Sequence, residues 1–576
     1  MYPATLLGIL RSRSKDERSS RRMTRCAGWA VALVTAVTVA GSGSPALANE
    51  LPRQPRIVNI YNFIRNSDYR VKDSEDVLFE ATKNQIALIK PTGMPVTWAL
   101  QYDALINPKY QKLLKEKIGK QDEIAAWWEI PRPLAEKAGL KWRGHDHEWD
   151  STANVGFSPG YTPEERRKLV DVYMAEFKSV FGYYPLTVGS WFIDEITLDY
   201  MVERYGIVAS CNCKDQVGTD GYTLWGGYWN QAYYPSKLNS YMPAQTKAGQ
   251  IDIPVFRMLG SDPIYQYGTK HHISSLEPVY GESGGSEKWV KWFLKNMIER
   301  PSLGFAYTQA GQENSFGWDS MKNGLKMQVK LLSAGVKSGD LQVMTLADSG
   351  RWFKKKYPLT PPTSMTYLDD WKEEGRRSVW YNSRFYRANF LWQDGGLLIR
   401  DIHRFDESVK AVTHDSALTT NTLAYTALPV MDSDTWSGPG PVGIFPVLLE
   451  KNGETSPMVP DGEPVVTELN ATDLSIVQKL AGGGKLSIIC QESQLAFSGE
   501  DAQGKPMAWA WDMKAGDGFA TAVTSASDSL ISFRSRDLEY NVTLSKGFGT
   551  CERKEGAVVR LLPNAKGRLV MGLGNP

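Results

Sequence analysis

Short apolar runs alternate with amphipathic helical patterns from Pro55 to about Tyr357. Arg56–Phe63 has the length and composition of a buried strand, whereas Pro163–Phe181 has helical periodicity and begins after Thr162, a good helix cap. The expected strands are Arg56–Phe63, Val96–Gln101, Glu123–Ile130, Leu186–Ile193, Val208–Cys213, Pro254–Leu259, Leu303–Thr308 and Gln342–Leu346. The expected helices are Asp76–Lys90, Pro108–Lys117, Pro163–Phe181, Asp194–Gly206, Glu287–Glu299 and Lys326–Ala334. Seven or eight alternating units predict a (β/α)7–8 barrel.

A proline-rich break at residues 357–363, YPLTPPT, separates this region from one with a different pattern. Beyond it, β-branched and aromatic residues alternate with polar ones between glycine-rich turns, as in Ser378–Trp392 and Ser529–Leu544. This alternation is typical of antiparallel sheets with one buried face. The sequence therefore predicts an α/β chain, with a barrel domain over 49–363 and an antiparallel β-sandwich region of one or two modules over 364–576.

The first 48 residues have the features of an export signal. Basic residues between Arg11 and Arg25 precede an apolar run, Ala27–Ala40, and the sequence ALA at 46–48 fits a cleavage site. The run is shorter than the roughly 20 residues that a membrane-spanning helix needs. We expect the mature protein to begin at Asn49 and to be secreted, by the general or the twin-arginine route.

Charge and cysteine content narrow the possible partners. The signal carries seven of the 66 Lys and Arg residues and two of the 64 Asp and Glu residues, so its removal changes the formal charge from +2 to about −3. No basic stripe or second apolar span remains, which argues against nucleic acid as a partner and against a membrane span.

Cys490 and Cys551 are the expected disulfide, whereas Cys211 and Cys213 are expected to be buried free thiols.

Polar residues gather where the expected strands end, which is where parallel sheets bind ligands. Most are acids and amides, and histidine is rare; the set is Asn62, Asp68, Gln101, Asp103, Glu129, Asp194, Lys214, Asp215, Gln216, Arg257, Asp262, Gln312, Glu313, Asn314 and Asp348. Carboxylates and amides can hold sugar hydroxyls, and aromatic rings can stack on sugar faces. The pattern favours a carbohydrate substrate, with no cofactor and no metal.

Residues 219–239 form an aromatic segment that strengthens this expectation. Trp225, Tyr228 and Trp229 lie within it among glycine and asparagine residues. Exposing this many aromatic rings to water is unfavourable. The segment is therefore expected either to pack on its own barrel or to form a sugar-stacking wall.

The motif around the fourth strand resembles that of glycoside hydrolase family 57. FGYYP at 181–185 precedes GSWFID at 189–194 and YGI at 205–207, and the family has a W-x-x-E motif at this strand end whose acid is the nucleophile. Here Trp191 and Asp194 keep the spacing, with Asp in place of Glu. The resemblance covers about 120–310 and implies the (β/α)7 barrel that this family shares with polysaccharide deacetylases. The whole chain also resembles an uncharacterised group of secreted bacterial proteins.

A secreted glycoside hydrolase that acts through a carboxylate pair, with retention of configuration, is the first hypothesis. Asp194 is the expected nucleophile, although an Asp before Glu195 is also a good helix cap. The resemblance assigns the acid to Glu313, which could equally be a solvated loop residue, and Asp215 is the competing catalytic candidate. The substrate-binding candidates are Glu129, Trp128, Trp191, Lys214, Trp225, Tyr228, Trp229 and Gln312.

Two alternatives remain open. Polysaccharide deacetylases of the similar type need an Asp on the first strand and an H-x-x-x-H pair after the third, whereas these strands end in NF at 62–63 and WE at 128–129. His145 and His147 could share a metal, and His271-His272 is the other cluster, although such clusters are more often surface loops. The third possibility is a glycan-binding protein without catalytic activity.

Overall fold

A computed structural model describes residues 54–574, except 220, 268–272, 435–436, 438–440, 517–521 and 555–556. The expected export signal over 1–48 and the pair His271-His272 lie outside the described residues. Within the described ranges, no helix is long and apolar enough to cross a membrane. The division of the chain at residue 363 stays a prediction.

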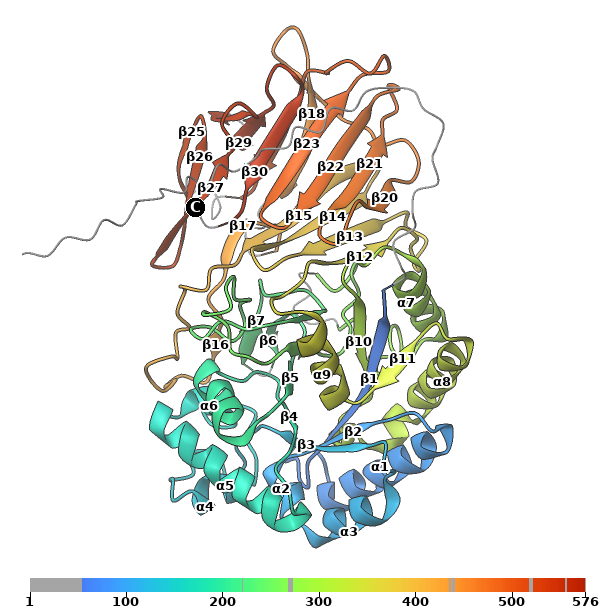
Figure 1. The fold of residues 1–576 in the computed structure, drawn as a ribbon, viewed down its shortest axis with the longest axis vertical. Coiled ribbons are helices and arrows are strands. Elements are labelled where there is room, and N and C mark those ends of the chain that lie inside the picture. The colour runs from blue at the N-terminus through green and yellow to red at the C-terminus, as the bar shows by residue number, and fades with distance from the viewer. Residues whose placement is uncertain are drawn as a thin grey trace, which may run out of the picture. The chain divides into compact units, whose positions relative to one another are not determined.

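The first half of the chain forms a nearly closed barrel sheet, so the predicted fold class is confirmed (Figure 1). Its strand order is β10-β1-β2-β3-β4-β5-β9-β8, with β11 beside β1, and all neighbours are parallel except β8 and β9. The strands are β1 (Arg56–Ile64), β2 (Thr97–Leu100), β3 (Glu123–Trp127), β4 (Thr187–Gly189), β5 (Ala209–Asn212), β8 (Ala232–Tyr233), β9 (Val255–Arg257), β10 (Ala306–Ala310) and β11 (Gln342–Met344). Between β9 and β10 the side-chain amide of Gln231 accepts a hydrogen bond from the Tyr307 amide (2.9 Å) and donates one to its carbonyl (3.3 Å).

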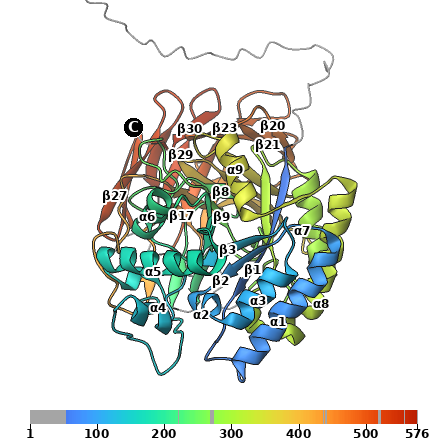
Figure 2. The same ribbon diagram turned by 60° about the horizontal axis from the view of Figure 1, so that its bottom comes forward.

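Helices cover the outside of this sheet, as Figure 2 shows for α1, α3, α5 and α8. The α-helices are α1 (Ser74–Ile89), α2 (Tyr102–Leu105), α3 (Pro108–Lys117), α4 (Arg132–Lys137), α5 (Pro163–Phe181), α6 (Glu195–Tyr205), α7 (Glu287–Glu299), α8 (Gly317–Ser338) and α9 (Leu346–Lys356). Short 3-10 turns are η1 (Lys90–Thr92), η2 (Ser158–Gly160) and η3 (Asn314–Phe316). The Thr162 hydroxyl caps α5 as its sequence predicts.

Side chains on β1 alternate between two hydrophobic cores, one inside the barrel and one between the sheet and the outer helices. Ile57, Tyr61 and Phe63 pack into the barrel interior, whereas Val58 and Ile60 pack outward beneath the helices. All nine residues of the strand are buried, so the apolar run has no solvent-facing side. The strand ends at Ile64, and the chain then leaves the barrel at the rim where the polar residues gather.

The second half is antiparallel, which also confirms the predicted β region. One ten-stranded sheet contains β12 (Thr363–Tyr367), β13 (Arg377–Asn382), β14 (Tyr386–Gln393), β15 (Gly396–Arg404), β17 (Leu428–Asp432), β18 (Gly443–Leu449), β19 (Thr455–Pro457), β24 (Trp509–Lys514), β28 (Thr550–Lys554) and β29 (Ala557–Leu562). An eight-stranded sheet contains β20 (Val465–Glu468), β21 (Leu474–Lys479), β22 (Lys485–Gln491), β23 (Gln494–Glu500), β25 (Val523–Ser527), β26 (Leu530–Ser535), β27 (Leu538–Leu544) and β30 (Arg568–Gly572). Phe497 and Trp511 join the two sheets, with ring centroids 5.3 Å apart.

The expected disulfide is wrong. Cys490 lies on β22 and Cys551 on β28, in different sheets, and both are buried free thiols. Cys211 and Cys213 are buried free thiols, as predicted. Burial raises the pKa of each of these two thiols to about 12, so they are poor nucleophiles.

A small sheet joins the barrel to the β region. Its strands are β6 (Gln216–Thr219), β7 (Tyr222–Leu224) and β16 (Leu423–Ala424), and β16 runs parallel to β7 (Figure 1). The segment expected to be a loop over 219–239 therefore contains strand residues, together with the short β8. Further along it, the ring of Trp229 stacks on Trp380 of β13 at a centroid distance of 3.8 Å.

Candidate functional site

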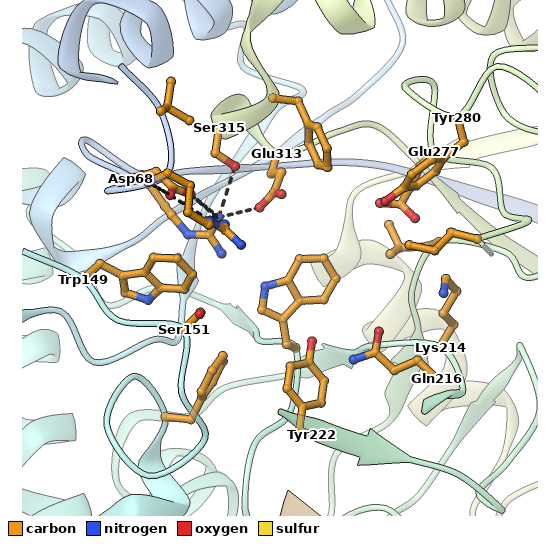
Figure 3. A pocket seen from close by; sticks show the side chains of 18 residues that line it. Asp68, Trp149, Ser151, Lys214, Gln216, Tyr222, Glu277, Tyr280, Glu313 and Ser315 are labelled. Carbon is orange, nitrogen blue, oxygen red and sulfur yellow. Dashed lines mark hydrogen bonds and ion pairs between the residues drawn. The ribbon is translucent and has the colours of Figure 1, made fainter. Parts of the chain in front are cut away.

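A cavity of about 370 Å³ opens at the carboxyl ends of the barrel strands. Most lining residues lie in segments that follow barrel strands, and Gln216 and Tyr222 lie on the small strands β6 and β7. The lining residues are Arg65, Asp68, Arg70, Val71, Trp149, Ser151, Phe157, Trp191, Lys214, Gln216, Tyr222, Leu259, Ile273, Glu277, Tyr280, Glu313, Ser315 and Phe316. Figure 3 shows Trp149 and Ser151 on one side of this pocket and Glu277 and Tyr280 on the other.

Arg65 lies at the centre of a buried ionic cluster. Its guanidinium donates to both carboxylate oxygens of Glu129 (2.8 and 2.6 Å) and to Glu313 (2.5 Å), and Asp68 lies 3.7 Å away. The side-chain amide of Gln101 also donates to Glu129. Only 1% of Arg65 is exposed, so this fixed charge is held by its carboxylate partners in a site with little water.

The backbone around this cluster is fixed by two features of the loop after β10. The side-chain amide of Asn314 accepts from the Arg65 amide (3.0 Å) and donates to the Arg65 carbonyl (2.8 Å). Gly311 has φ +109°, and a Cβ there would lie 2.2 Å from the Tyr61 carbonyl oxygen. Only glycine fits this approach, and it places Glu313 beside Arg65.

Two of the three acids beside Arg65, Glu313 and Asp68, differ in their ionisation. Burial raises the pKa of Glu313 to about 7, although the charges of Arg65 and Arg70 lower it. Asp68 is also buried, but hydrogen bonds from the Arg70 guanidinium (2.9 and 2.7 Å) and the charge of Arg65 bring its pKa below the ordinary value. Glu313 can therefore exchange a proton near neutral pH, whereas Asp68 stays ionised.

A second carboxyl, Glu277, lines the opposite side of the pocket. Burial raises its pKa above the ordinary value, although the charge of Lys214 and hydrogen bonds from Ser275 and Gln312 lower it. Glu277 is 4% exposed and Lys214 is 2% exposed, and Figure 3 shows both on the same side. The pocket therefore presents an acid and an amine together, across from the Arg65 cluster.

Aromatic rings complete the wall of the pocket. Trp191 packs edge-on against Phe63 (5.3 Å) and Trp127 (5.7 Å) of the barrel interior, so it lies between the barrel core and the cavity. The ring of Trp149 lies 4.2 Å from the Arg65 guanidinium carbon. Tyr222 on β7 brings the small joining sheet into the same wall. Flat rings beside fixed donors and acceptors are the elements from which sugar sites are built.

The structure brings together only part of the predicted site. Glu313, Trp191 and Lys214 line the pocket. Gln312 is buried directly behind it and contacts Glu277, and Glu129 lies behind Arg65 with its carboxylate occupied by that guanidinium.

Asp194 lies outside the pocket lining and caps helix α6. Its carboxylate accepts from the Thr197 amide (2.9 Å) and hydroxyl (2.6 Å), from the Ser158 hydroxyl (2.5 Å) and from the Arg166 guanidinium (3.1 Å). It is 1% exposed. With both oxygens engaged and no access to the cavity, this carboxylate has the geometry of the helix cap that the sequence left as its alternative.

Asp215 lies outside the pocket lining, between the lining residues Lys214 and Gln216, in an ionic cluster between the barrel and the β region. Its carboxylate pairs with Arg257 (2.6 Å) on β9 and with Arg387 (2.5 Å) on β14. Arg387 also forms a bidentate pair with Asp401 (2.9 and 2.8 Å) on β15. All these side chains are buried, so Asp215 ties the barrel to the sheet.

The remaining predicted binding residues pack inside the protein. Trp225 donates to Asp432 (2.7 Å) on β17, and Tyr228 donates to the Pro361 carbonyl (2.8 Å). Trp229 stacks on Trp380 of the β region, and Trp128, which follows β3, packs beneath the helices with its ring 6.0 Å from that of Tyr173 on α5. The aromatic segment therefore packs on its own protein, and its contribution to the pocket is Tyr222.

Sequence reasoning missed Arg65, Trp149 and Glu277. Arg65 lies two residues beyond Phe63, the end of the first expected strand, so extending the search by two residues could have found it. Trp149 and Glu277 lie in long irregular segments, where no periodic pattern indicates which side chains face the barrel. The loops were the least informative part of the sequence and supply much of the wall.

The residues at this rim do not fit the divalent metal that the deacetylase resemblance implies. The first strand brings Asn62 rather than an Asp, and the third brings Glu129 without the histidine pair. The cation beside the carboxylates is the guanidinium of Arg65. Among the described residues, no three His, Cys, Asp or Glu side chains are grouped to hold a metal ion, and the rings of His145 and His147 lie 6.5 Å apart.

Comparisons with known proteins identify similar barrels at low identity. No protein-family model matches the chain, and no curated protein matches it. A solved structure described as a glycoside hydrolase/deacetylase from Parabacteroides distasonis is 15% identical, with 66% of this chain and 92% of that chain covered and a TM-score of 0.48. Polysaccharide deacetylases, as they are described, from Mycobacterium smegmatis and Pseudomonas aeruginosa are 11% and 12% identical, with 55% and 53% of this chain and 97% and 93% of theirs covered and TM-scores of 0.34 and 0.33.

These findings correct the glycosidase hypothesis. The similar solved barrels are described chiefly as deacetylases, and none points to glycoside hydrolase family 57 specifically. Of the predicted pair, Glu313 lines the pocket and Asp194 does not, and the competing candidate Asp215 pairs with Arg257 and Arg387 outside the lining. The assignment as a glycosidase is therefore withdrawn, and the barrel itself is shown by the strand order of this chain.

Proposed function

We propose that this protein binds a saccharide in the pocket at the carboxyl end of its barrel, without a metal ion. The observation that carries the proposal is the lining: the aromatic residues Trp149, Trp191 and Tyr222 line the pocket beside two buried carboxyls, Glu313 and Glu277. Small-molecule sites combine apolar walls with a few fixed polar groups in this way.

The polar groups suit hydroxyl-rich ligands. Arg65 and Asn314 hold the Glu313 side of the pocket in place, and Lys214 with Glu277 offers a donor and an acceptor on the other side. Because Arg65 holds Glu313 and the Ser275 hydroxyl donates to Glu277 (2.8 Å), a ligand meets carboxyls that are fixed before binding, and little ordering free energy is lost.

The test is a glycan array followed by calorimetry with the chain from Asn49 onward. We expect binding to a saccharide class that survives treatment with a chelator and is lost in Trp191→Ala. Trp352→Ala is the matched control, because Trp352 is also partly buried but packs against Phe305 and Tyr357, away from the pocket lining. Binding that is unchanged in Trp191→Ala, or that requires added metal, would overturn the proposal.

A second candidate function is the removal of an acyl group from the bound saccharide, also without metal. The pKa of Glu313, about 7, favours it, because a carboxylate with that pKa can take a proton from water near neutral pH. The water oxygen would attack the acyl carbonyl carbon, and the sugar oxygen or nitrogen would leave with a proton. Acetate release from acetylated oligosaccharides, insensitive to chelator and absent in Glu313→Gln, is the expected result if this activity exists.

The export signal leads to a proposal about location. The basic region and apolar run over 11–40 support secretion of the mature chain. Amino-terminal sequencing of protein recovered from the culture medium tests it, and the expected first residue is Asn49. Protein that stays in the cell with its first 48 residues intact would contradict it.

A further inference from the structure

The rim of the pocket carries a second pair of rings that the proposed function leaves unused. Tyr69 and His147 are stacked, with ring centroids 5.0 Å apart and an interplanar angle of 12°. Tyr69 is 44% exposed, and His147 is exposed as well. Tyr69 follows β1, and His147 lies in the loop between α4 and α5, so two separate loops bring the pair together.

This pair continues the wall of the pocket. The Tyr69 hydroxyl and the Ser151 hydroxyl are hydrogen-bonded at 3.0 Å, and Ser151 lines the cavity. The Arg70 guanidinium lies 5.0 Å from the Trp149 ring and 5.9 Å from the Tyr69 ring. An uninterrupted series of contacts therefore leads from the buried ring of Trp149 to the exposed ring of Tyr69.

The opposite rim also has aromatic residues. Tyr280 and Phe316 pack edge to face at 6.4 Å, and Phe316 is 39% exposed. Figure 3 shows Tyr280 across the pocket from Trp149. The cavity of about 370 Å³ has room for about one or two sugar rings, so a longer chain would extend over these rims.

The loop that carries His147 is held by its own hydrogen bonds. The Trp142 indole donates to the His145 carbonyl (2.9 Å), and the Asp150 carboxylate accepts from the Thr152 amide (2.8 Å) and hydroxyl (2.7 Å). These bonds hold the His147 side of the ring pair, and the hydrogen bond between the Tyr69 and Ser151 hydroxyls holds the other side. This preformed surface costs little to use in binding.

We propose that Tyr69 and His147 form an outer sugar subsite, and that the ligand is a segment of a polysaccharide chain rather than a small saccharide. The inference rests on the proposed function of the pocket. One part of the chain occupies the cavity, and the following units lie across the exposed ring of Tyr69. Stacking on one ring contributes a modest share of the affinity, and only ligands that reach it gain that share.

The test compares disaccharides with hexasaccharides built from xylose, from glucose and from N-acetylglucosamine, by calorimetry on the chain from Asn49 onward. In at least one series, we expect the wild type to bind the hexasaccharide about five- to tenfold more tightly than the disaccharide. Tyr69→Ala is expected to remove this preference and to leave disaccharide affinity unchanged. Tyr69→Phe keeps the ring and is expected to keep the preference.

Tyr183→Ala is the matched control, because Tyr183 is 46% exposed and packs against Phe177 and Phe181 of α5, away from the pocket lining. Equal affinity of the wild type for both lengths, or a length preference that survives in Tyr69→Ala, would overturn the outer subsite while the proposed function stands. Absence of binding in every series would overturn the proposed function and the outer subsite with it.

Discussion

At the scale of single residues, the same side-chain type has opposite roles in different surroundings. Asp194 and Glu313 both follow barrel strands, and the sequence makes one the expected nucleophile and the other the expected acid. Asp194 is enclosed by a helix amino terminus and Arg166, whereas Glu313 faces the cavity beside Arg65. The role of Asp194 as a helix cap could be predicted from the sequence. Its ion pair with Arg166 could not be predicted, because Arg166 belongs to another helix and lies 28 residues earlier in the chain.

The ionisation of Glu313 gives a prediction about pH. Burial raises its pKa from 4.5 to about 7, so folding favours the protonated form. The contribution of this carboxyl to stability is fully present below pH 4.5 and is lost as the pH rises through 7. Between about pH 5 and about pH 8, Glu313→Gln should lose less unfolding free energy than the wild type, by about 1–3 kcal/mol.

Chemical denaturation at the two pH values measures this difference. Glu116→Gln, at an exposed position on α3, is the control and should follow the wild type. Parallel pH dependence of Glu313→Gln and the wild type would show that Glu313 does not titrate in this range.

Removal of the Asp194 carboxylate should affect folding and leave ligand binding intact. Asp194→Ala leaves the buried charge of Arg166 without its partner, so we expect the unfolding free energy to fall by about 3–5 kcal/mol. Asp348→Ala, which breaks an exposed pair with Arg351, should cost about 1 kcal/mol or less. Thermal unfolding measures both, and saccharide affinity is measured below the transition. Loss of saccharide affinity in folded Asp194→Ala would contradict this prediction and show that Asp194 contributes to binding.

At the scale of elements, alternation and helix caps could be predicted well, and the loops could not. The buried run of β1 and the capped helix α5 follow from local patterns that solvent and backbone geometry enforce. The expected strand Leu186–Ile193 shortens to Thr187–Gly189, although the backbones of Ser190 and Trp191 still bond those of Cys211 and Cys213. Loop residues such as Trp149 show no periodic pattern of apolar positions, so the direction of their side chains depends on tertiary contacts.

The loop after β10 provides a prediction at this scale. Gly311→Ala would place a Cβ 2.2 Å from the Tyr61 carbonyl oxygen at φ +109°, so we expect a loss of about 2–4 kcal/mol and weaker saccharide binding. Gly139→Ala, at φ +70° with nothing within 4 Å, should cost about 1 kcal/mol and leave binding unchanged. Chemical denaturation with calorimetry separates the two. Equal effects would mean that the close approach to Tyr61 is not needed.

At the scale of the molecule, the β region helps to build the site. Strand β16 pairs with β7, which carries Tyr222 into the pocket wall, and Arg387 of β14 pairs with Asp215 behind that wall. The sequence pattern changes near residue 363, from alternating helices and strands to strands alone. It predicts neither of these contacts, because both join residues more than 150 positions apart. The support that the β region gives to the pocket is therefore visible in the folded structure and not in the sequence.

Arg387→Met tests this cooperation. It leaves the buried carboxylates of Asp215 and Asp401 without their shared partner, so we expect a lower unfolding temperature and weaker saccharide binding in the folded state. Arg560→Met breaks the bidentate pair with Asp512 within the ten-stranded sheet and should lower the unfolding temperature without changing affinity. Unchanged affinity in folded Arg387→Met would show that the β region does not support the pocket.

The most direct measurement of the central claim is calorimetric titration of chelator-treated wild type and Trp191→Ala with the saccharide class found on the array. The account predicts that the wild type binds without metal and that Trp191→Ala does not, while Trp352→Ala behaves as the wild type. Binding that appears only after a divalent metal is restored, or that is equal in Trp191→Ala, would contradict it.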